Sequence, residues 1–378
     1  MNILHLCNKF PFPGRDGSSI AMESLIRLEG LLGHRIHVLA LNTDKHYVDS
    51  PKQPTHVAEL DAPSLSIVPS MNNFFKTKHW QCSYFASRFY QTAIAASIEK
   101  ASRSADLTVI DSLFMAVYRK HIHGPVLLRC HNIEHQIWEE TLKHKSLKGM
   151  AYAWEVKRLK TWENELLSSM PTLAISEEDA DYIRSNGGRC TVIPSTWSDL
   201  QWSLSGASSP SVYHLGAMDW EPNIKGMQWL MDEVLPHLST VDLHVLSKTQ
   251  PPAFNQLPKG ITWTKEHVAD NWFDDHGIFI APILSGSGMR IKILEAMARG
   301  KAVVTTPIGA AGIKAIAGKH LMVAHSAEAF AVAMEDLQQD EGMRLGLGQA
   351  ARLHAMTHFL DNVHLKGLDQ ALTAASHG

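Results

Sequence analysis

The chain has 378 residues, of which 45% are hydrophobic and 19% are charged. This composition is typical of a globular protein, and a single hydrophobic core stops growing at roughly 250–300 residues, so we expect two domains. The net charge of −3 lacks the strongly basic balance of a nucleic-acid-binding protein, and we expect no nucleic acid partner.

The cysteines and histidines favour neither a disulfide framework nor a metal centre. The four cysteines lie far apart and form no CxxC pair, which fits a reducing compartment. The 22 histidines are scattered, so we expect no metal site. The apolar run at residues 3–7 is too short for a signal peptide, and we find no candidate membrane span. We therefore expect a cytoplasmic protein.

The first half of the chain begins with the pattern of a doubly wound α/β sheet. Residues 3–7 predict a strand, residues 19–32 a helix and residues 35–41 a second strand. A long helix is predicted over residues 146–169. Further strands are predicted at residues 65–68, 107–110, 126–130, 172–175 and 191–193. The alternation of strands and helices is typical of a parallel sheet.

A serine-rich stretch divides the chain. We predict a first domain over residues 1–197, a linker over 198–211 and a second domain over 212–355. Residues 356–378 are predicted to form a helix that returns to the first domain. After the linker we expect strands at residues 212–215, 243–246 and 261–264 and a helix at residues 224–235. Two α/β halves of similar size favour a ligand cleft between domains.

The most informative segment is residues 277–312. It predicts a buried strand over residues 278–283, a glycine-rich turn over 285–288, a helix that begins near Gly288 and ends at Gly300, and another strand over residues 302–306. The start of a helix offers unpaired N–H groups and the positive end of the backbone dipole, which favours a bound anion. Arg290 and Lys292 add two cations at that end, and the backbone amides of Gly288, Met289 and Arg290 would add donors, with Ser287 as a cap. The segment therefore predicts a diphosphate-binding site.

Five segments, in order along the chain, resemble the GT-B fold glycosyltransferases, in particular family four of the retaining enzymes. These segments are PFPGRDGSS with GHRIHVLAL, RCHNIEHQIW, LAISEEDADYI, YHLGAMDWEPNIKGMQWL and GSGMRIKILEAMARGKAVVTTPIGAAGI. The chain departs from the family pattern at Ser287, where many members carry a glutamate, and at Ala217, where an arginine is frequent. Pro194, Ser195 and Thr196 replace a frequent PNG. We therefore assign diphosphate binding to Arg290 and Lys292.

The resemblance implies an α/β fold with two Rossmann-like doubly wound parallel-sheet domains facing a central cleft. It implies a metal-independent, retaining hexosyltransferase of surface polysaccharide or glycoconjugate biosynthesis, with no cofactor. The second domain would bind a UDP- or GDP-linked sugar donor, and the first a glycan or polyprenyl-linked acceptor. Two alternatives stay open: a sugar-nucleotide epimerase of the same fold, and a non-catalytic nucleotide-sugar-binding partner.

The predicted catalytic residues are His131, Arg290, Lys292 and Glu295. By resemblance, Arg290 and Lys292 also offset the charge that builds up on the leaving diphosphate. Glu295 would accept hydrogen bonds from the ribose hydroxyls. Its alternative role is an ion pair with Arg299 at the i+4 position. His131 would hydrogen-bond the donor sugar, or alternatively serve as a structural histidine.

Three further features each have two interpretations. Gly17 and Ser18 lie in a loop of small residues that would approach the donor, or that simply caps the next helix through Asp16 or Ser18. The Asp179–Asp181 pair resembles a metal-binding DxD motif, but its acidic context favours a helix start. An aromatic and basic segment at residues 72–90, together with basic residues between 143 and 160, would allow peripheral contact with the inner face of a membrane. Ordinary core aromatics beside solvated lysines are the alternative.

Overall fold

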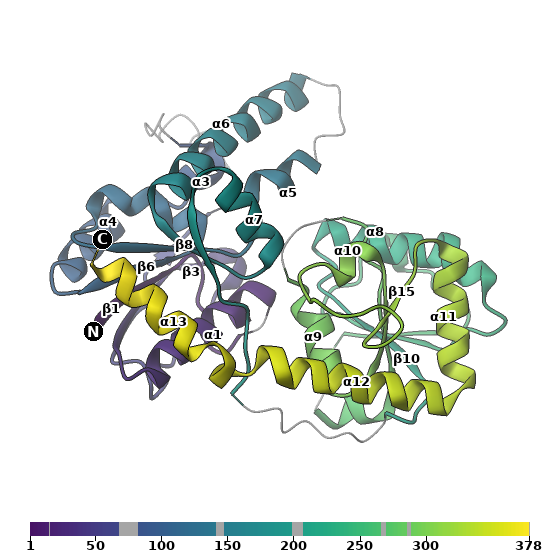
Figure 1. Ribbon diagram of the computed structural model, residues 1–378. Helices are drawn as coiled ribbons and strands as arrows, with labels where there is room; N and C mark the ends of the chain where they lie inside the picture. Colours follow the sequence, from purple (N-terminus) through teal and green to yellow (C-terminus); the bar gives the residue numbers. More distant parts are fainter. Residues whose placement is uncertain are drawn as a thin grey trace. The chain divides into compact units, whose positions relative to one another are not determined.

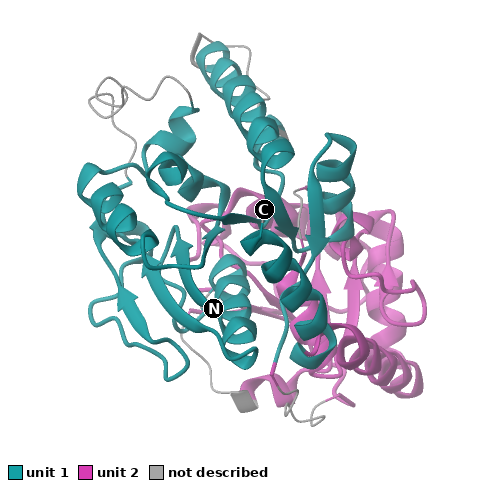
Figure 2. Cartoon of the chain, turned by 60° about the vertical axis from the view of Figure 1, so that its left-hand side comes forward, with its two compact units in different colours: residues 1–197, 361–378 teal, residues 198–360 magenta. Residues whose placement is uncertain are grey.

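The computed structural model describes residues 1–14, 16–67, 82–140, 147–198, 207–265, 270–285 and 289–377 (Figure 1). The chain divides into two compact units (Figure 2). Unit 1 comprises Met1–Trp197 and Asp361–Gly378, and unit 2 comprises Ser198–Leu360. In the described ranges, no helix combines the length and the apolar character needed to cross a bilayer.

Unit 1 contains a seven-stranded parallel sheet in the order β4-β2-β1-β6-β7-β8-β9. Its strands are β1 (Asn2–Cys7), β2 (Arg35–Ala40), β4 (Glu59–Asp61), β6 (Leu107–Asp111), β7 (Val126–Cys130), β8 (Pro171–Ala174) and β9 (Arg189–Val192). A separate pair joins β3 (Asn42–Thr43) to β5 (Ser64–Leu65), so the strand predicted at 65–68 lies earlier than expected. The strand order reverses between β1 and β6, and ligands of such sheets bind beyond the strand ends at this switch point.

The helices of unit 1 cover its sheet and include the last segment of the chain (Figure 1). They are α1 (Gly17–Leu31), α3 (Tyr84–Ser87), α4 (Thr92–Ser102), α5 (Glu134–Glu140), α6 (Leu147–Ser169), α7 (Glu177–Ser185) and α13 (Asp361–Ser376), with 3-10 turns η1 (Asp44–His46) and η2 (Leu113–His121). Leu368 and Leu372 of α13 are fully buried in one cluster with Leu25 and Leu28 of α1. Asp361, at the start of α13, pairs with Arg27 at 2.9 Å. The chain therefore returns to unit 1 at Asp361, whereas the sequence placed this boundary at residue 356.

Unit 2 contains a six-stranded parallel sheet in the order β12-β11-β10-β13-β14-β15. Its strands are β10 (Val212–Leu215), β11 (Leu243–Leu246), β12 (Ile261–Thr264), β13 (Ile278–Ala281), β14 (Ala302–Thr305) and β15 (Met322–Val323). Its helices are α8 (Glu221–Trp229), α9 (Ile291–Ala298), α10 (Pro307–Ala310), α11 (Ala327–Gln339) and α12 (Glu341–Phe359), with short turns η3 (Leu230–Val234), η4 (Leu235–His237), η5 (Pro252–Phe254) and η6 (Asp270–Asp275). The order reverses between β10 and β13, the strands that precede α8 and α9. This is the strand order of a dinucleotide-binding sheet.

Two predicted helix starts in unit 2 are wrong by about one turn. Helix α8 begins at Glu221 rather than residue 224, because Pro222 occupies the first turn, where its missing N–H costs nothing. Helix α9 begins at Ile291, not near Gly288, because Arg290 holds a non-helical ψ of 80°. Glu295 therefore lies about 6 Å from the helix start, measured along the helix axis at 1.5 Å per residue.

Candidate functional site

At the switch point of unit 2, the side chain of Lys292 contacts the first turn of α8, which follows β10. Its Nζ atom donates a hydrogen bond to Oδ1 of Asn223 at 3.1 Å, and Nδ2 of Asn223 donates to the carbonyl of Ala217 at 2.9 Å. Gly226 permits this approach, because a Cβ atom there would lie 1.8 Å from the carbonyl oxygen of Pro282, after β13. The starts of α8 and α9 are therefore held side by side.

Lys292 is a half-buried cation beside a second cation. Among the described residues it forms no ion pair. Burial, and then the positive charge of Arg290, lower the pKa of Lys292 to about 7. A site that destabilises its own lysine cation in this way favours an anion, since the anion would restore the charged form.

His214 of β10 adds a neutral acceptor to this cluster. Its Nδ1 atom lies 2.9 Å from the carbonyl of Ile280, so this nitrogen carries the proton and Nε2 carries a lone pair. Burial and the neighbouring Lys292 lower the pKa of His214 to about 3. A Cβ atom at Gly216 would lie 2.9 Å from Nε2, so the glycine leaves room beside it. Among the described residues, no group bonds to Nε2.

Neither Asn223 nor His214 is among the site residues predicted from the sequence. Both belong to the segment YHLGAMDWEPNIKG, which carried part of the family resemblance. A histidine two residues before a glycine, at the end of a predicted strand, was the available signal, because ligands bind at the carboxyl end of the first strand of a doubly wound sheet.

Glu295 forms the ion pair that was its alternative role. Its Oε1 atom lies 3.1 Å from Nη2 of Arg299, and the Arg299 guanidinium lies 4.2 Å from the ring centroid of Phe273. The Glu295 side chain keeps 25% of its surface exposed, so one pairing does not occupy all of its acceptor positions. Ribose binding by Glu295 stays a prediction.

The remaining predicted residues of this segment divide into two groups. Met289 is buried and its carbonyl accepts a hydrogen bond from the amide of Ile291 at 3.2 Å. Ser287 and Gly288 lie outside the described residues. The predicted cap by Ser287 is therefore untested, and Arg290 occupies the N-cap position without a side-chain capping bond.

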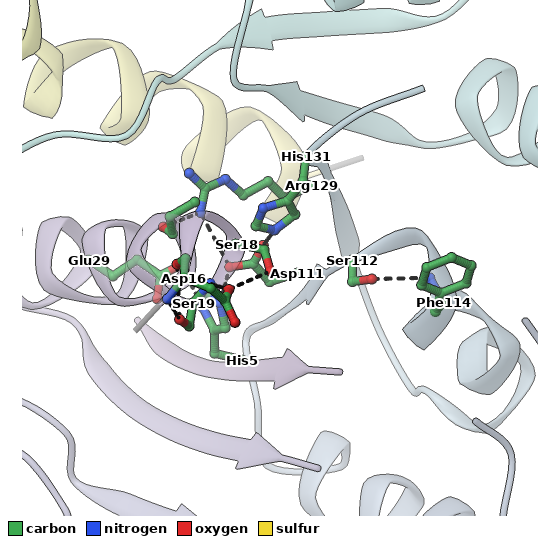
Figure 3. Close-up of polar contacts among 11 residues, drawn as sticks. His5, Asp16, Ser18, Ser19, Glu29, Asp111, Ser112, Phe114, Arg129 and His131 are labelled. Carbon is green, nitrogen blue, oxygen red and sulfur yellow. Dashed lines mark hydrogen bonds and ion pairs between the residues drawn. The ribbon is translucent and has the colours of Figure 1, made fainter. Parts of the chain in front are cut away.

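At the switch point of unit 1, Asp111 connects three basic side chains (Figure 3). Its carboxylate lies 2.6 Å from Nε2 of His131, 2.9 Å from Nε2 of His5 and 3.3 Å from Nη1 of Arg129. The other ring nitrogen of His5 lies 3.0 Å from Glu29 of α1. Parallel register explains the cluster, since Asp111 pairs with Cys7 in β1 and with Arg129 in β7. His5 shares the face of Cys7, because side chains alternate along a strand.

These buried groups are paired as two cations and two anions. Burial opposes ionisation of Asp111, but Arg129 and His131 hold its pKa well below the usual range. Burial likewise opposes the charge on His5, yet Glu29 and the bond to Asp111 raise its pKa well above the usual range. Burial lowers the pKa of His131 despite Asp111, so His131 is neutral and donates through Nε2.

His131 faces a cavity of about 230 Å³ at the carboxyl end of the sheet. Ser18 of α1 and Ser112, which follows β6, also line it. Ser112 has φ of 150°, a conformation that non-glycine residues rarely adopt and that concentrates at binding sites. The structure therefore gives His131 an oriented neutral imidazole in a pocket, and its hydrogen bond to a donor sugar stays a prediction.

The loop before α1 serves as a helix cap, its alternative role. The Asp16 side chain accepts a hydrogen bond from the amide of Ser19 at 3.0 Å and from Oγ of Ser18 at 3.2 Å. Asp16 also pairs with Lys9 at 2.9 Å. Gly17 is exposed as the first residue of α1, and Ser18 still lines the cavity. Capping and ligand approach are therefore compatible at this loop.

Among the described residues, one cluster and one histidine pair resemble metal sites. Ligating atoms of His5, Cys7 and Asp111 lie within 4.8 Å of one another, but both ring nitrogens of His5 already bond to carboxylates. His131 and His135 have a spacing that metal sites use, yet His135 lies 2.6 Å from Glu163 while His131 bonds to Asp111. The hydrogen bonds account for both groupings without a metal ion.

The acidic stretch after β8 starts a helix, as its context predicted. The Ser176 side chain accepts a hydrogen bond from the amide of Asp179 at 3.2 Å, and Asp179 is buried while Asp181 is 74% exposed. The two carboxylates therefore do not form one site.

Part of the aromatic and basic segment lies outside the described residues, which exclude 68–81 and 141–146. Within the described part, Phe85 stacks on Trp138 at 4.4 Å and belongs to the core. Met150 and Trp154 of α6 are 70% and 49% exposed. Core packing thus explains Phe85, and membrane contact stays untested.

Comparison with known proteins finds one matching family and several similar structures. The family described as "Glycosyl transferases group 1" matches residues 209–340. A Klebsiella pneumoniae protein, described as an uncharacterised 44.6 kDa protein in the cps region, is 24% identical over 223 residues. That match covers 54% of this chain and 57% of the relative, so it spans little more than half of the relative's length.

Three solved structures show the same fold. A sucrose-phosphate synthase from Thermosynechococcus elongatus has a TM-score of 0.73 at 14% identity, covering 98% of both chains. HepE from Anabaena, in complex with UDP-glucose, has a TM-score of 0.67 at 14% identity, covering 99% of this chain and 100% of its own. S. aureus TarM, in complex with Fondaparinux, alpha-GlcNAc-glycerol and UDP, has a TM-score of 0.67 at 10% identity, covering 98% and 99%. The predicted fold class is confirmed: the chain has the GT-B fold, and its residues 209–340 form a Glycosyl transferases group 1 domain.

Proposed function

We propose that the protein transfers a hexose from a nucleotide diphosphate-sugar to a glycan or lipid-linked glycan in surface polysaccharide biosynthesis. Unit 2 binds the UDP- or GDP-linked donor, and unit 1 binds the acceptor. The reaction retains the anomeric configuration and uses no metal or other cofactor. HepE and TarM, which share the fold, were solved with UDP, and the relative from the cps region supports the polysaccharide setting.

The observation that carries this proposal is the cationic switch point of the group 1 domain. Arg290 and Lys292 begin α9, Asn223 orients the lysine, and the lysine forms no ion pair among the described residues. Two such cations neutralise a diphosphate in the donor and the charge that develops on it when the sugar–phosphate bond breaks. Glu295, one turn further along the helix, then accepts hydrogen bonds from the ribose.

Slow hydrolysis of the donor tests this function. Wild-type protein is incubated with UDP- and GDP-linked hexoses, and release of free nucleoside diphosphate is measured. We expect release from one donor, and a loss of at least about tenfold in Glu295→Ala and in His131→Ala, since each removes a hydrogen bond to an ionised or polarised group. Glu221→Ala, which removes an exposed carboxylate of α8, should leave the rate unchanged.

The same assay separates the alternatives. Interconversion of the nucleotide sugars without release of nucleotide would support the epimerase instead. Tight binding of a nucleotide sugar with neither release nor transfer would support a non-catalytic partner.

Nucleotide affinity should weaken as the pH rises above about 7. Lys292 has a pKa of about 7 in the empty site, and a bound diphosphate raises it. Binding is therefore coupled to uptake of a proton between these two pKa values, and each pH unit in that window lowers the affinity by up to tenfold. Titration calorimetry of the preferred nucleoside diphosphate at pH 6.5, 7.5 and 8.5 measures this slope.

Lys292→Arg provides the control for the pH dependence. A guanidinium stays charged throughout this range, so the variant should bind with an affinity that changes little with pH. A wild-type affinity that does not vary between pH 6.5 and 8.5 would show that Lys292 does not contact the phosphates.

A further inference from the structure

The cavity of unit 1 contains an arginine that forms no ion pair among the described residues, although the charges of Glu134 and Asp44 act on it from a greater distance. Arg88 lines the cavity and is half-buried. Its Nε atom donates to the carbonyl of Phe85 at 3.2 Å, and its guanidinium lies 5.3 Å from the ring centroid of Phe89. Among the described residues, no carboxylate forms an ion pair with it. Lys9, which follows β1 and also lines the cavity, is by contrast paired with Asp16.

The lining of the cavity includes an acid, Glu134, at the start of α5. A second carboxylate, that of Glu163, already occupies this helix start: it accepts hydrogen bonds from the amides of Glu134 and His135 at 2.8 and 3.0 Å. Burial, and then repulsion by Glu163, raise the pKa of Glu134 to about 8. At neutral pH Glu134 is therefore a neutral carboxylic acid that donates one hydrogen bond and does not cancel the charge of Arg88.

The cavity thus combines a cation, a neutral acid and the neutral imidazole of His131. Lys45 and His46, from the η1 turn, add basic groups to the same lining. A neutral sugar hydroxyl would leave the guanidinium without a counter-ion, whereas a carboxylate or phosphate would accept from both Arg88 and the acid. The positive charge and the hydrogen-bond donors of the cavity therefore both favour an anionic ligand.

We propose that this cavity selects an anionic acceptor, a sugar that carries a carboxylate or phosphate close to its accepting hydroxyl, through Arg88 with Glu134 as a hydrogen-bond donor. The proposal rests on the proposed glycosyl transfer and adds the substrate class of its acceptor site.

Matched probes test the proposal on the full chain. Binding of p-nitrophenyl β-glucuronide is compared with that of p-nitrophenyl β-glucoside, which carries a neutral hydroxymethyl group in place of the carboxylate. Glucose 6-phosphate is compared with glucose in the same way. We expect at least one anionic probe to bind tenfold or more tightly than its neutral partner. The carboxylate pair and the phosphate pair together distinguish an acidic sugar from a phosphorylated acceptor.

Three variants assign the preference to the cavity. Arg88→Gln should abolish it, and Arg88→Lys should keep part of it. Arg103→Gln, which removes an exposed arginine at the C-cap of α4 that pairs with Glu99, should leave it unchanged. Circular dichroism of Arg88→Gln confirms that the variant is folded before its affinities are compared.

The pH dependence of the preference tests the part played by Glu134. The charged groups that act on Glu134 are Glu163 of α6, Asp179 of α7 and Arg88 of the segment after α3, and Asn132 bonds to it. Above about pH 8 the ionised acid repels the probe, so the preference should fall there. Glu134→Gln cannot ionise and should keep the preference at pH 9.

Equal affinity for charged and neutral probes in the wild type would overturn the proposal. So would a preference that survives in Arg88→Gln. If the nucleoside diphosphate competes with the anionic probe, the cavity binds donor phosphate instead. Each of these results leaves donor hydrolysis intact, so it is distinguishable from a failure of the proposed transferase activity.

Discussion

Replacing Asp111 with alanine should lower the free energy of unfolding of the protein by about 3–5 kcal/mol, the cost of breaking a buried ion network by removing one partner. The variant keeps the protonated His5 and Arg129 in a fully buried site, where Glu29 is the remaining counter-ion among the described residues. It also removes the acceptor that fixes the His131 ring. Urea unfolding measures the loss, and donor hydrolysis by the folded fraction should fall with it.

Asp181 provides the comparison for this prediction. It is 74% exposed and pairs with Arg184 on the surface of α7. Asp181→Ala should therefore change the urea midpoint far less than Asp111→Ala. If the two variants have a similar urea midpoint, the buried groups around Asp111 are not ionised as the prediction assumes.

Removing both cations of α9, in Arg290→Gln with Lys292→Met, should weaken binding of the preferred nucleoside diphosphate by at least about 100-fold. Each charge-assisted hydrogen bond contributes about 1.5–3 kcal/mol, or roughly tenfold or more in affinity. Fold stability should not fall, because Lys292 is held in a site that opposes its charge. Unfolding of the variant at pH 7 should occur at the same or higher urea concentration than that of the wild type.

Lys225→Met is the control for the double variant. Lys225 is an exposed lysine of α8 that pairs with Glu221 at 3.4 Å. Its loss should leave nucleotide affinity within about twofold, since surface ion pairs contribute little. Equal weakening in the control and in the double variant would mean that general positive charge, and not the switch point, attracts the nucleotide.

The sequence predicts the sheets well because buried parallel strands are recognisable as apolar runs. β13 at Ile278–Ala281 and β14 at Ala302–Thr305 are fully buried, and both were predicted, the first too long because Pro282 ends it. The cations of α9 were predicted for a local reason as well. Arg290 and Lys292 lie at a helix start, where the backbone dipole disfavours them unless an anion is present.

Contacts between distant segments were not predictable in the same way. His5, Asp111 and Arg129 meet because β6 lies between β1 and β7, an order that no local pattern encodes. Asn223 reaches Lys292 only after α8 packs on the loop at Pro282. Even within one helix, the sequence leaves the role of Glu295 open. Its position is compatible with binding a ribose and also with an i,i+4 ion pair to Arg299.

A crystal structure with the preferred nucleoside diphosphate tests the central claim most directly. We expect phosphate oxygens within about 3 Å of Nζ of Lys292 and of the Arg290 guanidinium, the ordinary distance of a charge-assisted hydrogen bond. A nucleotide bound with its phosphates away from the start of α9, while both side chains face solvent, would contradict the assignment.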